Sequence, residues 1–191
     1  VDVYTSEKVI RFEGENGHVT KVITDKRELG AQLVILGAGF IPNSKLAQDA
    51  GLEIAPFGGI VADDHLRTSD PDIYTGGDCA ATKNIITGKI GYLPLGSQAN
   101  RQGRVIGSNL GGIDSTFPGF VGTWCVKLFK LSFAGVGLTP PKAVAAGFDA
   151  AGVCIEQLNR AHFYPEKEMM SLEIVVDKSN RRVLGLQGCC K

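Results

Sequence analysis

The chain has 191 residues, of which 43% are apolar, and its 20 Lys and Arg residues balance 20 Asp and Glu residues. This length and apolar content can form a core in one or two domains. The even charge argues against nucleic acid or an anionic membrane as a partner, and no apolar run reaches the ~18 residues of a membrane-spanning helix.

The first predicted element is a β-hairpin. Lys8–Phe12 reads as a strand, and His18–Thr24 alternates polar and apolar residues as a return strand does. Between them, Asn16 and Gly17 form the dipeptide that supplies the two positive φ values of a tight hairpin turn.

Residues 33–43, LVILGAGFIPN, predict a buried strand over Gln32–Gly37 that ends in a flexible turn. Gly37-Ala38-Gly39 also begins like the phosphate-binding turn of a dinucleotide fold, which is the alternative interpretation. Pro42 stands where that motif has its third glycine and disfavours a helix through this point. We therefore expect a helix only after it, over Lys45–Ala50, with Asn43 or Ser44 as N-cap.

A short strand near Gly59–Ala62 is followed by a second one, Ile73-Tyr74-Thr75, which Gly76-Gly77 interrupts and which delivers Asp78 at its carboxyl end. Ligands of open α/β sheets bind at that end of the strands, where a carboxylate can accept hydrogen bonds from a sugar or polyol. Local chemistry alone favours the other interpretation, in which Asp78 is a capping or turn aspartate.

Residues 94–110 predict a helix with Pro94 in its first turn. Gly96, Gly103 and Gly107 each weaken this helix by ~1 kcal/mol relative to alanine, so we expect another element to pack closely against it.

A glycine-rich change of composition at 111–119 predicts a domain boundary, with domains over 1–115 and 120–191. The second domain reads as an α+β unit with an antiparallel sheet. Its expected elements are the strand Thr123–Lys130, the helix Pro141–Gly147, the strands Ala151–Leu158, Met170–Asp177 and Arg182–Gln187, and a polar turn at Asp177–Asn180.

The five cysteines show neither a C-x-x-C motif nor the spacing of a zinc site. Their odd number, without a secretion signal, predicts reduced thiols and a cytoplasmic protein. Cys189-Cys190 leaves two interpretations open: ordinary thiols, which we favour, and a vicinal redox pair. The histidines and the carboxylates of residues 63–78 have no metal or triad spacing, so we predict no metal site and no catalytic residue.

The order of these motifs resembles the pyridine nucleotide-disulfide oxidoreductase family, in its branch of coenzyme A-disulfide reductases, NADH oxidases and NADH peroxidases. The resemblance rests on an apolar strand ending in Gly-x-Gly-x-x-Pro-Asn, on Thr68-x-x-x-x-Ile-Tyr-Thr-x-Gly-Asp78, and on the helix with Ala99–Arg104. Further similar segments are Gly122-Thr123, Gly137-Leu138-Thr139, His162–Pro165 and Val183–Gly188.

The resemblance implies an α/β partial FAD/NAD(P)-binding domain followed by an α+β interface domain with an antiparallel sheet. It implies FAD and NAD(P)H as cofactors, with Gly77 and Asp78 at the ribityl chain of FAD. Gly37, Ala38 and Gly39 would lie near the nicotinamide, and Leu95, Gly96 and Ser97 would direct backbone N–H groups to the flavin. A homodimer through residues 120–191 is implied as well.

The family's two G-x-G-x-x-G cradles and its redox cysteine do not occur in this sequence. We therefore interpret the chain as the C-terminal part of a longer enzyme that passes electrons from NAD(P)H through FAD to a disulfide, peroxide or oxygen, and we expect the fragment itself to be inactive. The alternative is a non-catalytic dimerising module with a decayed nucleotide site. A simple NAD-dependent dehydrogenase is disfavoured by Pro42.

Overall fold

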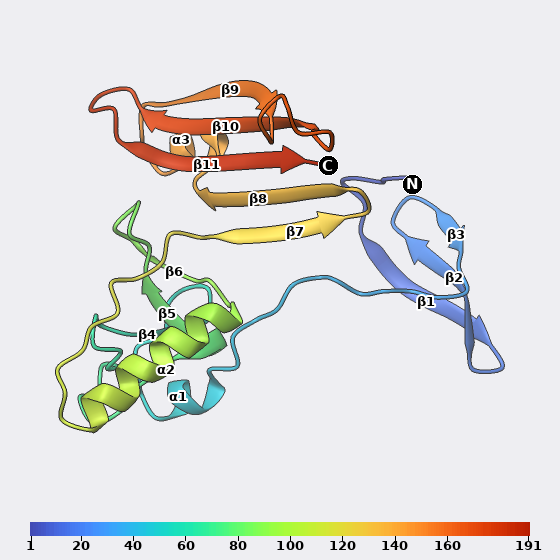
Figure 1. Cartoon of the computed structure of the whole chain (residues 1–191). Coiled ribbons are helices and arrows are strands. Elements are labelled where there is room, and N and C mark those ends of the chain that lie inside the picture. Colours follow the sequence, from blue (N-terminus) through green and yellow to red (C-terminus); the bar gives the residue numbers. More distant parts are fainter. The chain divides into compact units, whose positions relative to one another are not determined.

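The computed structural model describes all residues, 1–191, and divides into two compact units, Val1–Phe40 and Ile41–Lys191 (Figure 1). The second unit contains residues from both domains expected from the sequence, and the boundary expected between residues 115 and 120 stays a prediction.

The first unit is an antiparallel three-stranded meander of β1 (Val9–Glu15), β2 (His18–Thr24) and β3 (Glu28–Gly30). Asn16 and Gly17 have φ values of 51° and 79° and join β1 to β2. Positive φ at both central residues is what a two-residue hairpin requires, so the predicted hairpin is confirmed.

The predicted buried strand Gln32–Gly37 is wrong for this chain. The segment forms no strand, and the side chains of Leu33, Ile35 and Leu36 are 77%, 85% and 71% exposed. No strand of the chain pairs with it, because the sheet of the first unit ends at β3. A strand without neighbours leaves its backbone groups to water and buries no apolar surface.

The second unit begins with α1 (Lys45–Asp49), with Ser44 as its N-cap residue, and the predicted helix is confirmed. Next comes a small sheet in the order β4-β5-β6, made of β4 (Ile60–Val61), β5 (Ala80–Lys83) and β6 (Ile90–Gly91). The strands β4 and β5 are parallel, while β5 and β6 are antiparallel.

Ile73-Tyr74-Thr75 does not form the predicted strand. The segment makes one isolated bridge, between Tyr74 and Arg67, flanked by the backbone hydrogen bonds Thr68 N to Ile73 O and Thr75 N to Leu66 O. No strand pairs with the other side of this segment, so its extended backbone does not continue into a sheet.

The long helix α2 (Gly96–Leu110) begins two residues later than predicted, so Pro94 precedes the N-cap Leu95 rather than entering the first turn. One side of α2 packs through Val105 and Ile106 against a core of Ala62, Leu66 and Phe117. The predicted close neighbour of its glycines is absent, because a Cβ at Gly96, Gly103 or Gly107 would meet nothing within 4 Å.

Residues 124–190 form a five-stranded antiparallel sheet in the order β7-β8-β11-β10-β9, which confirms the expected α+β unit. Its elements are β7 (Trp124–Leu128), β8 (Leu131–Gly137), α3 (Pro140–Ala145), β9 (Ala150–Leu158), β10 (Met169–Asp177) and β11 (Val183–Cys190). The strand β8 was not expected from the sequence, because its two glycines and its serine weaken the pattern of a strand.

The core of this sheet is formed by Leu138, Ala143, Val175 and Leu184. Ile86, from the loop between β5 and β6, packs against the same core. This contact, together with the hydrogen bond from Arg182 Nη2 to Ile85 O at 3.3 Å, joins the small sheet to the large one.

The polar turn predicted at Asp177–Asn180 is confirmed. The Asp177 carboxylate, on a residue that is only 6% exposed, accepts hydrogen bonds from the Ser179 hydroxyl at 2.7 Å, the Ser179 N–H at 3.0 Å and the Asn180 side chain at 3.2 Å. The bonds from Ser179 are the main cause of a lowered Asp177 pKa, below its ordinary value of 3.8. The charged form is therefore the one that the fold favours.

Asp177→Asn should lower the thermal stability of the protein at neutral pH. Because folding lowers the Asp177 pKa, the carboxylate stabilises the fold fully above pH 3.8, and this stabilisation is lost as the pH falls through the folded-state value. The gap between wild-type and variant melting temperatures, followed by circular dichroism, should close over that acidic range. The carboxylate of Asp72 accepts no hydrogen bond, so Asp72→Asn is the control. A difference in melting temperature between wild type and Asp177→Asn that does not change with pH would contradict the prediction.

Gln102→Ala should destabilise the second unit by about 1–3 kcal/mol, which is the usual cost of leaving a buried polar group unpaired. The Gln102 side chain is 3% exposed, and its Oε1 accepts the Gly77 N–H at 2.7 Å. Urea unfolding measures this change. Gln98→Ala is a matched control on the same helix, because the Gln98 Oε1 has no partner to lose. An equal loss in both variants would mean that the bond to Gly77 contributes nothing.

Candidate functional site

The turn that carries Asp78 lies directly against α2. It contains the single 3-10 turn η1 (Gly77–Cys79), and Gly77 has a φ of +78°, which favours glycine. A Cβ at Gly76 would stand 2.9 Å from Ile106 Cδ1 and 3.4 Å from Gln102 Cβ. The two glycines therefore let the backbone approach the helix more closely than a side chain would allow.

Three hydrogen bonds fix this turn. Gly77 donates its N–H to Gln102 Oε1 at 2.7 Å, and the Tyr92 hydroxyl donates to the Asp78 carbonyl oxygen at 2.7 Å. The Cys79 thiol makes a weaker contact with Asn43 O at 3.6 Å. The backbone is thus tied on both sides of the Asp78 side chain.

The Asp78 side chain itself is exposed and accepts no hydrogen bond from the chain. Asp63 and Asp70 differ, because their carboxylates accept backbone N–H groups two to four residues ahead, as turn aspartates do. Asp78 therefore lies in a turn, as the interpretation favoured by local sequence expected, but its carboxylate caps no backbone N–H group. Its carboxylate is free to accept hydrogen bonds from a ligand.

The start of α2 offers donors. Its N-cap residue Leu95 has no side-chain acceptor, and the N–H groups of Gly96 and Ser97 have no acceptor within the chain. Unpaired N–H groups and the helix dipole together make a helix N-terminus favourable for negative charge.

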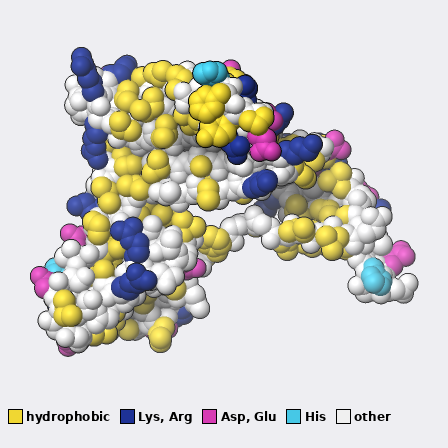
Figure 2. All heavy atoms as spheres, viewed as in Figure 1, with side chains coloured by type: hydrophobic (Ala, Val, Ile, Leu, Met, Phe, Trp, Pro, Cys, Tyr) yellow, Lys and Arg dark blue, Asp and Glu magenta, His cyan; other side chains and the backbone are white.

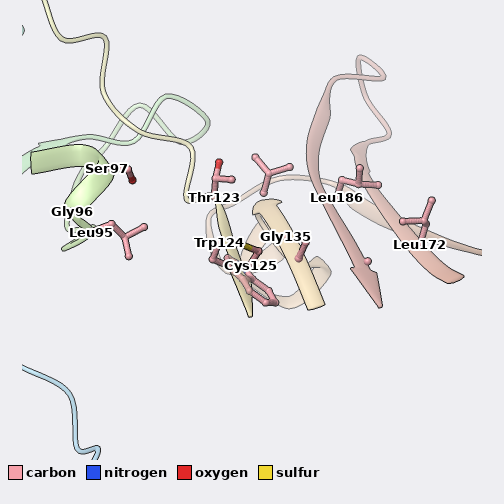
Figure 3. Close-up of a pocket in the computed structure, with 12 residues that line it drawn as sticks. Leu95, Gly96, Ser97, Thr123, Trp124, Cys125, Gly135, Leu172 and Leu186 are labelled. Atoms are coloured by element: carbon pink, nitrogen blue, oxygen red, sulfur yellow. The ribbon is translucent and has the colours of Figure 1, made fainter. Parts of the chain in front are cut away.

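A cavity of about 680 Å³ opens beside this helix start. Leu95, Gly96 and Ser97 line one side of it, and the strands of the five-stranded sheet line the other, as Figure 3 shows. Thr123, which precedes β7, lines this other side together with mostly apolar groups of the sheet: Trp124, Cys125, Ala134, Gly135, Val136, Leu172, Leu186 and Gly188. The helix N-terminus therefore faces an apolar space.

Tyr92 supports the turn from a partly buried position, with its ring centroid 5.9 Å from that of Phe57. Burial raises the pKa of the Tyr92 hydroxyl above its ordinary value of 10.0, and electrostatic interaction with Asp78 and Cys79 raises it further. The hydroxyl therefore stays protonated and acts as a donor at neutral pH.

The remaining predicted site residues, Gly37, Ala38 and Gly39, lie in the first unit. They are exposed and form no helix or strand, and Gly39 has a φ of +81°. The structure thus brings Gly77 and Asp78 together with α2, while the place of Gly37–Gly39 near a nicotinamide stays a prediction.

The cysteines form no disulfide. Cys189 and Cys190 pair with successive residues of β10, Ser171 and Met170, so their side chains alternate between the two faces of the sheet. This alternation is unfavourable for a vicinal redox pair. No three His, Cys, Asp or Glu side chains lie together as a metal cluster, and none of the helices has the length and apolarity needed to cross a membrane.

Gln102 and Tyr92 were not predicted from the sequence as residues of the site. Gln102 could have been found, because it lies within the predicted helix and shares a face with Ala99, Val105 and Ile106, three or four residues away. No spacing rule points to Tyr92, which reaches Asp78 through the fold of the loop between β6 and α2.

Two family descriptions match the chain. "Pyridine nucleotide-disulphide oxidoreductase" matches residues 1–103, and the dimerisation domain of the same family matches residues 124–191. The expected fold class, a partial FAD/NAD(P)-binding domain followed by an interface domain, is thereby confirmed, while the expected bounds 1–115 and 120–191 stay a prediction.

Among curated proteins, the NAD(P)H sulfur oxidoreductase (CoA-dependent) of Pyrococcus abyssi is 38% identical over 98% of the chain and 42% of its own length. The NADH oxidase of Enterococcus faecalis is 34% identical, with the same coverage of 98% and 42%. The chain therefore spans less than half of the relatives that it matches.

Solved structures of the same family have a fold similar to that of this chain. The NAD-dependent persulfide reductase from A. fulgidus superimposes with a TM-score of 0.93 at 39% identity, over 98% of the chain and 35% of that protein. An FAD-dependent pyridine nucleotide-disulphide oxidoreductase from Desulfovibrio vulgaris gives a TM-score of 0.84 at 55% identity, over 97% and 44%. From its sequence matches and its fold, the chain belongs to the pyridine nucleotide-disulphide oxidoreductase family.

Proposed function

We propose that the chain is the C-terminal part of an FAD-dependent NAD(P)H oxidoreductase that works in the cytoplasm. The observation that carries the proposal is the Asp78 carboxylate, which is exposed and unpaired on a turn that is otherwise fixed by hydrogen bonds. A rigid turn with a free acceptor fits a binding residue better than a structural one.

The groups around Asp78 fit FAD. The carboxylate is an acceptor for a hydroxyl of the ribityl chain, while the N–H groups of Gly96 and Ser97 are donors for the electron-rich edge of the flavin ring. Leu95 and the apolar cavity beside it offer a surface for an aromatic ring system. FAD bound there would supply the redox chemistry, accepting electrons from NAD(P)H.

In the parent enzyme, the turn Gly37-Ala38-Gly39 would approach the nicotinamide of NAD(P)H. Its two glycines and one alanine carry almost no side chain, so a flat ring can approach the backbone. The electron acceptor is a disulfide such as coenzyme A disulfide, a peroxide or oxygen. The sulfur reductases among the relatives, at 38–39% identity, favour a sulfur acceptor over oxygen, for which the NADH oxidase is 34% identical.

We further propose a homodimer through residues 120–191, which the dimerisation-domain match supports. Apolar side chains gather over the sheet in Figure 2. Val153 and Ile155, on the edge strand β9, are 52% and 50% exposed, and they pair with Ile174 and Leu172 on the same face. An exposed apolar edge strand can pair with another chain, so natural proteins usually cover such strands.

Asp78→Ala in the full-length enzyme should weaken FAD binding about 10- to 100-fold, because it removes a hydrogen bond to a charged acceptor. Flavin retained after gel filtration, read from visible absorption, and the dissociation constant from flavin fluorescence measure the effect. Asp72→Ala is the control, since it removes an equally charged carboxylate from the neighbouring loop.

Unchanged FAD binding in the Asp78 variant would overturn the site. A wild-type enzyme that binds no flavin at all, yet still dimerises, would favour the alternative of a dimerising module with a decayed nucleotide site.

Ile155→Lys should shift the full-length protein from dimer to monomer, because it places a charge in the apolar face that we propose is buried. Mass measured by light scattering after gel filtration reports the change. Val144→Lys makes the same kind of change on α3, where Val144 is 60% exposed, and should leave the mass unchanged. A dimer that survives Ile155→Lys would place the interface elsewhere.

A further inference from the structure

Tyr92 joins the two polar elements of the proposed flavin site. It lies between β6 and α2, three residues before the helix N-cap Leu95, and its hydroxyl reaches back to the Asp78 carbonyl oxygen at 2.7 Å. Tyr92 thus connects the segment before α2, whose first N–H groups are free donors, with Asp78, whose carboxylate is free.

The hydrogen bond from Tyr92 is placed so that it can fix the backbone of Asp78. On one side of Asp78, the Gly77 N–H is held by Gln102, and on the other the Asp78 carbonyl is held by Tyr92. Gly77 alone would give the turn unusual freedom, because glycine populates positive and negative φ about equally. With both bonds in place the backbone of Asp78 is fixed, and with it the direction of the Cα–Cβ bond.

We propose that Tyr92 is a positioning residue for FAD binding, whose hydroxyl holds the Asp78 backbone so that the carboxylate meets a ribityl hydroxyl. The inference rests on the proposed function of Asp78. Tyr92 acts through Asp78 and contacts no reacting atom. Pre-orienting the carboxylate before the flavin arrives lowers the ordering cost of binding, which appears as affinity.

The test is a double-mutant cycle in the full-length enzyme, with FAD as the ligand and Asp78→Ala, Tyr92→Phe and their combination as variants. Tyr92→Phe keeps the ring beside Phe57 and removes only the hydroxyl. It should weaken FAD binding about 3- to 10-fold, the usual effect of one neutral hydrogen bond. In the Asp78→Ala background the same change should have no effect on the dissociation constant, because Tyr92 acts only through the carboxylate.

Tyr74→Phe is the matched control. It also removes one tyrosine hydroxyl, which accepts a hydrogen bond from Arg67 Nε at 3.1 Å away from Asp78. It should leave FAD affinity unchanged, whatever it does to the melting temperature of the apoenzyme. With FAD at saturation, the KM for NADH of the Tyr92 variant should match that of wild type.

The outcomes separate the two claims. If Asp78→Ala leaves FAD binding intact, the proposed function fails. If Asp78→Ala weakens binding while Tyr92→Phe does not, the function stands and the role of Tyr92 is overturned. Equal weakening by Tyr92→Phe in both backgrounds also overturns it, since Tyr92 would then act independently of Asp78.

Discussion

The proposed site depends on the close contact between the Gly76-Gly77 backbone and α2. At Gly76 a side chain would collide with Ile106, and at Gly77 the positive φ excludes most other residues. The contact brings the Gly77 N–H to the buried Gln102, and the carboxylate of the next residue, Asp78, is exposed and accepts no hydrogen bond. The two glycines are therefore required for packing, and the aspartate that follows them is left available for binding.

A second close contact holds the C-terminal sheet in register. Gly137 of β8 pairs with Gly185 of β11, and a Cβ on Gly185 would lie 2.1 Å from the Leu138 carbonyl oxygen. This steric limit explains two of the segments that resemble the family, Gly137-Leu138-Thr139 and the Gly185 region, as structural requirements. Ile86 packs against the core at this crossing, so the loop between β5 and β6 contributes to the core of the large sheet.

Sequence reasoning succeeded where the signal is local. The Asn16-Gly17 hairpin, the helix after Pro42 and the alternating strands β9 and β10 are specified by turn chemistry, backbone restriction or periodicity within a few residues. It failed for β5 and β6, whose four and two residues are too short to show a period. The role of Asp78 could not be decided from the sequence either, because a free carboxylate and a capping one have the same sequence and differ only in their hydrogen bonds.

Two further failures, the buried strand at Gln32–Gly37 and the close neighbour expected for the α2 glycines, share one physical cause. The segment with Leu33, Ile35 and Leu36 has the composition of a buried strand, yet these side chains are exposed. The helix α2 has glycines at positions 103 and 107, as a closely packed helix does, yet nothing lies within 4 Å of a Cβ at either position. The composition of a segment indicates whether it is suited to a buried or an exposed position. The structure of these 191 residues contains only the neighbours that the 191 residues themselves supply. Relatives more than twice as long contain further chain that could supply these neighbours. The mismatch between composition and exposure therefore supports the proposal that the site around Asp78 is completed within a longer protein.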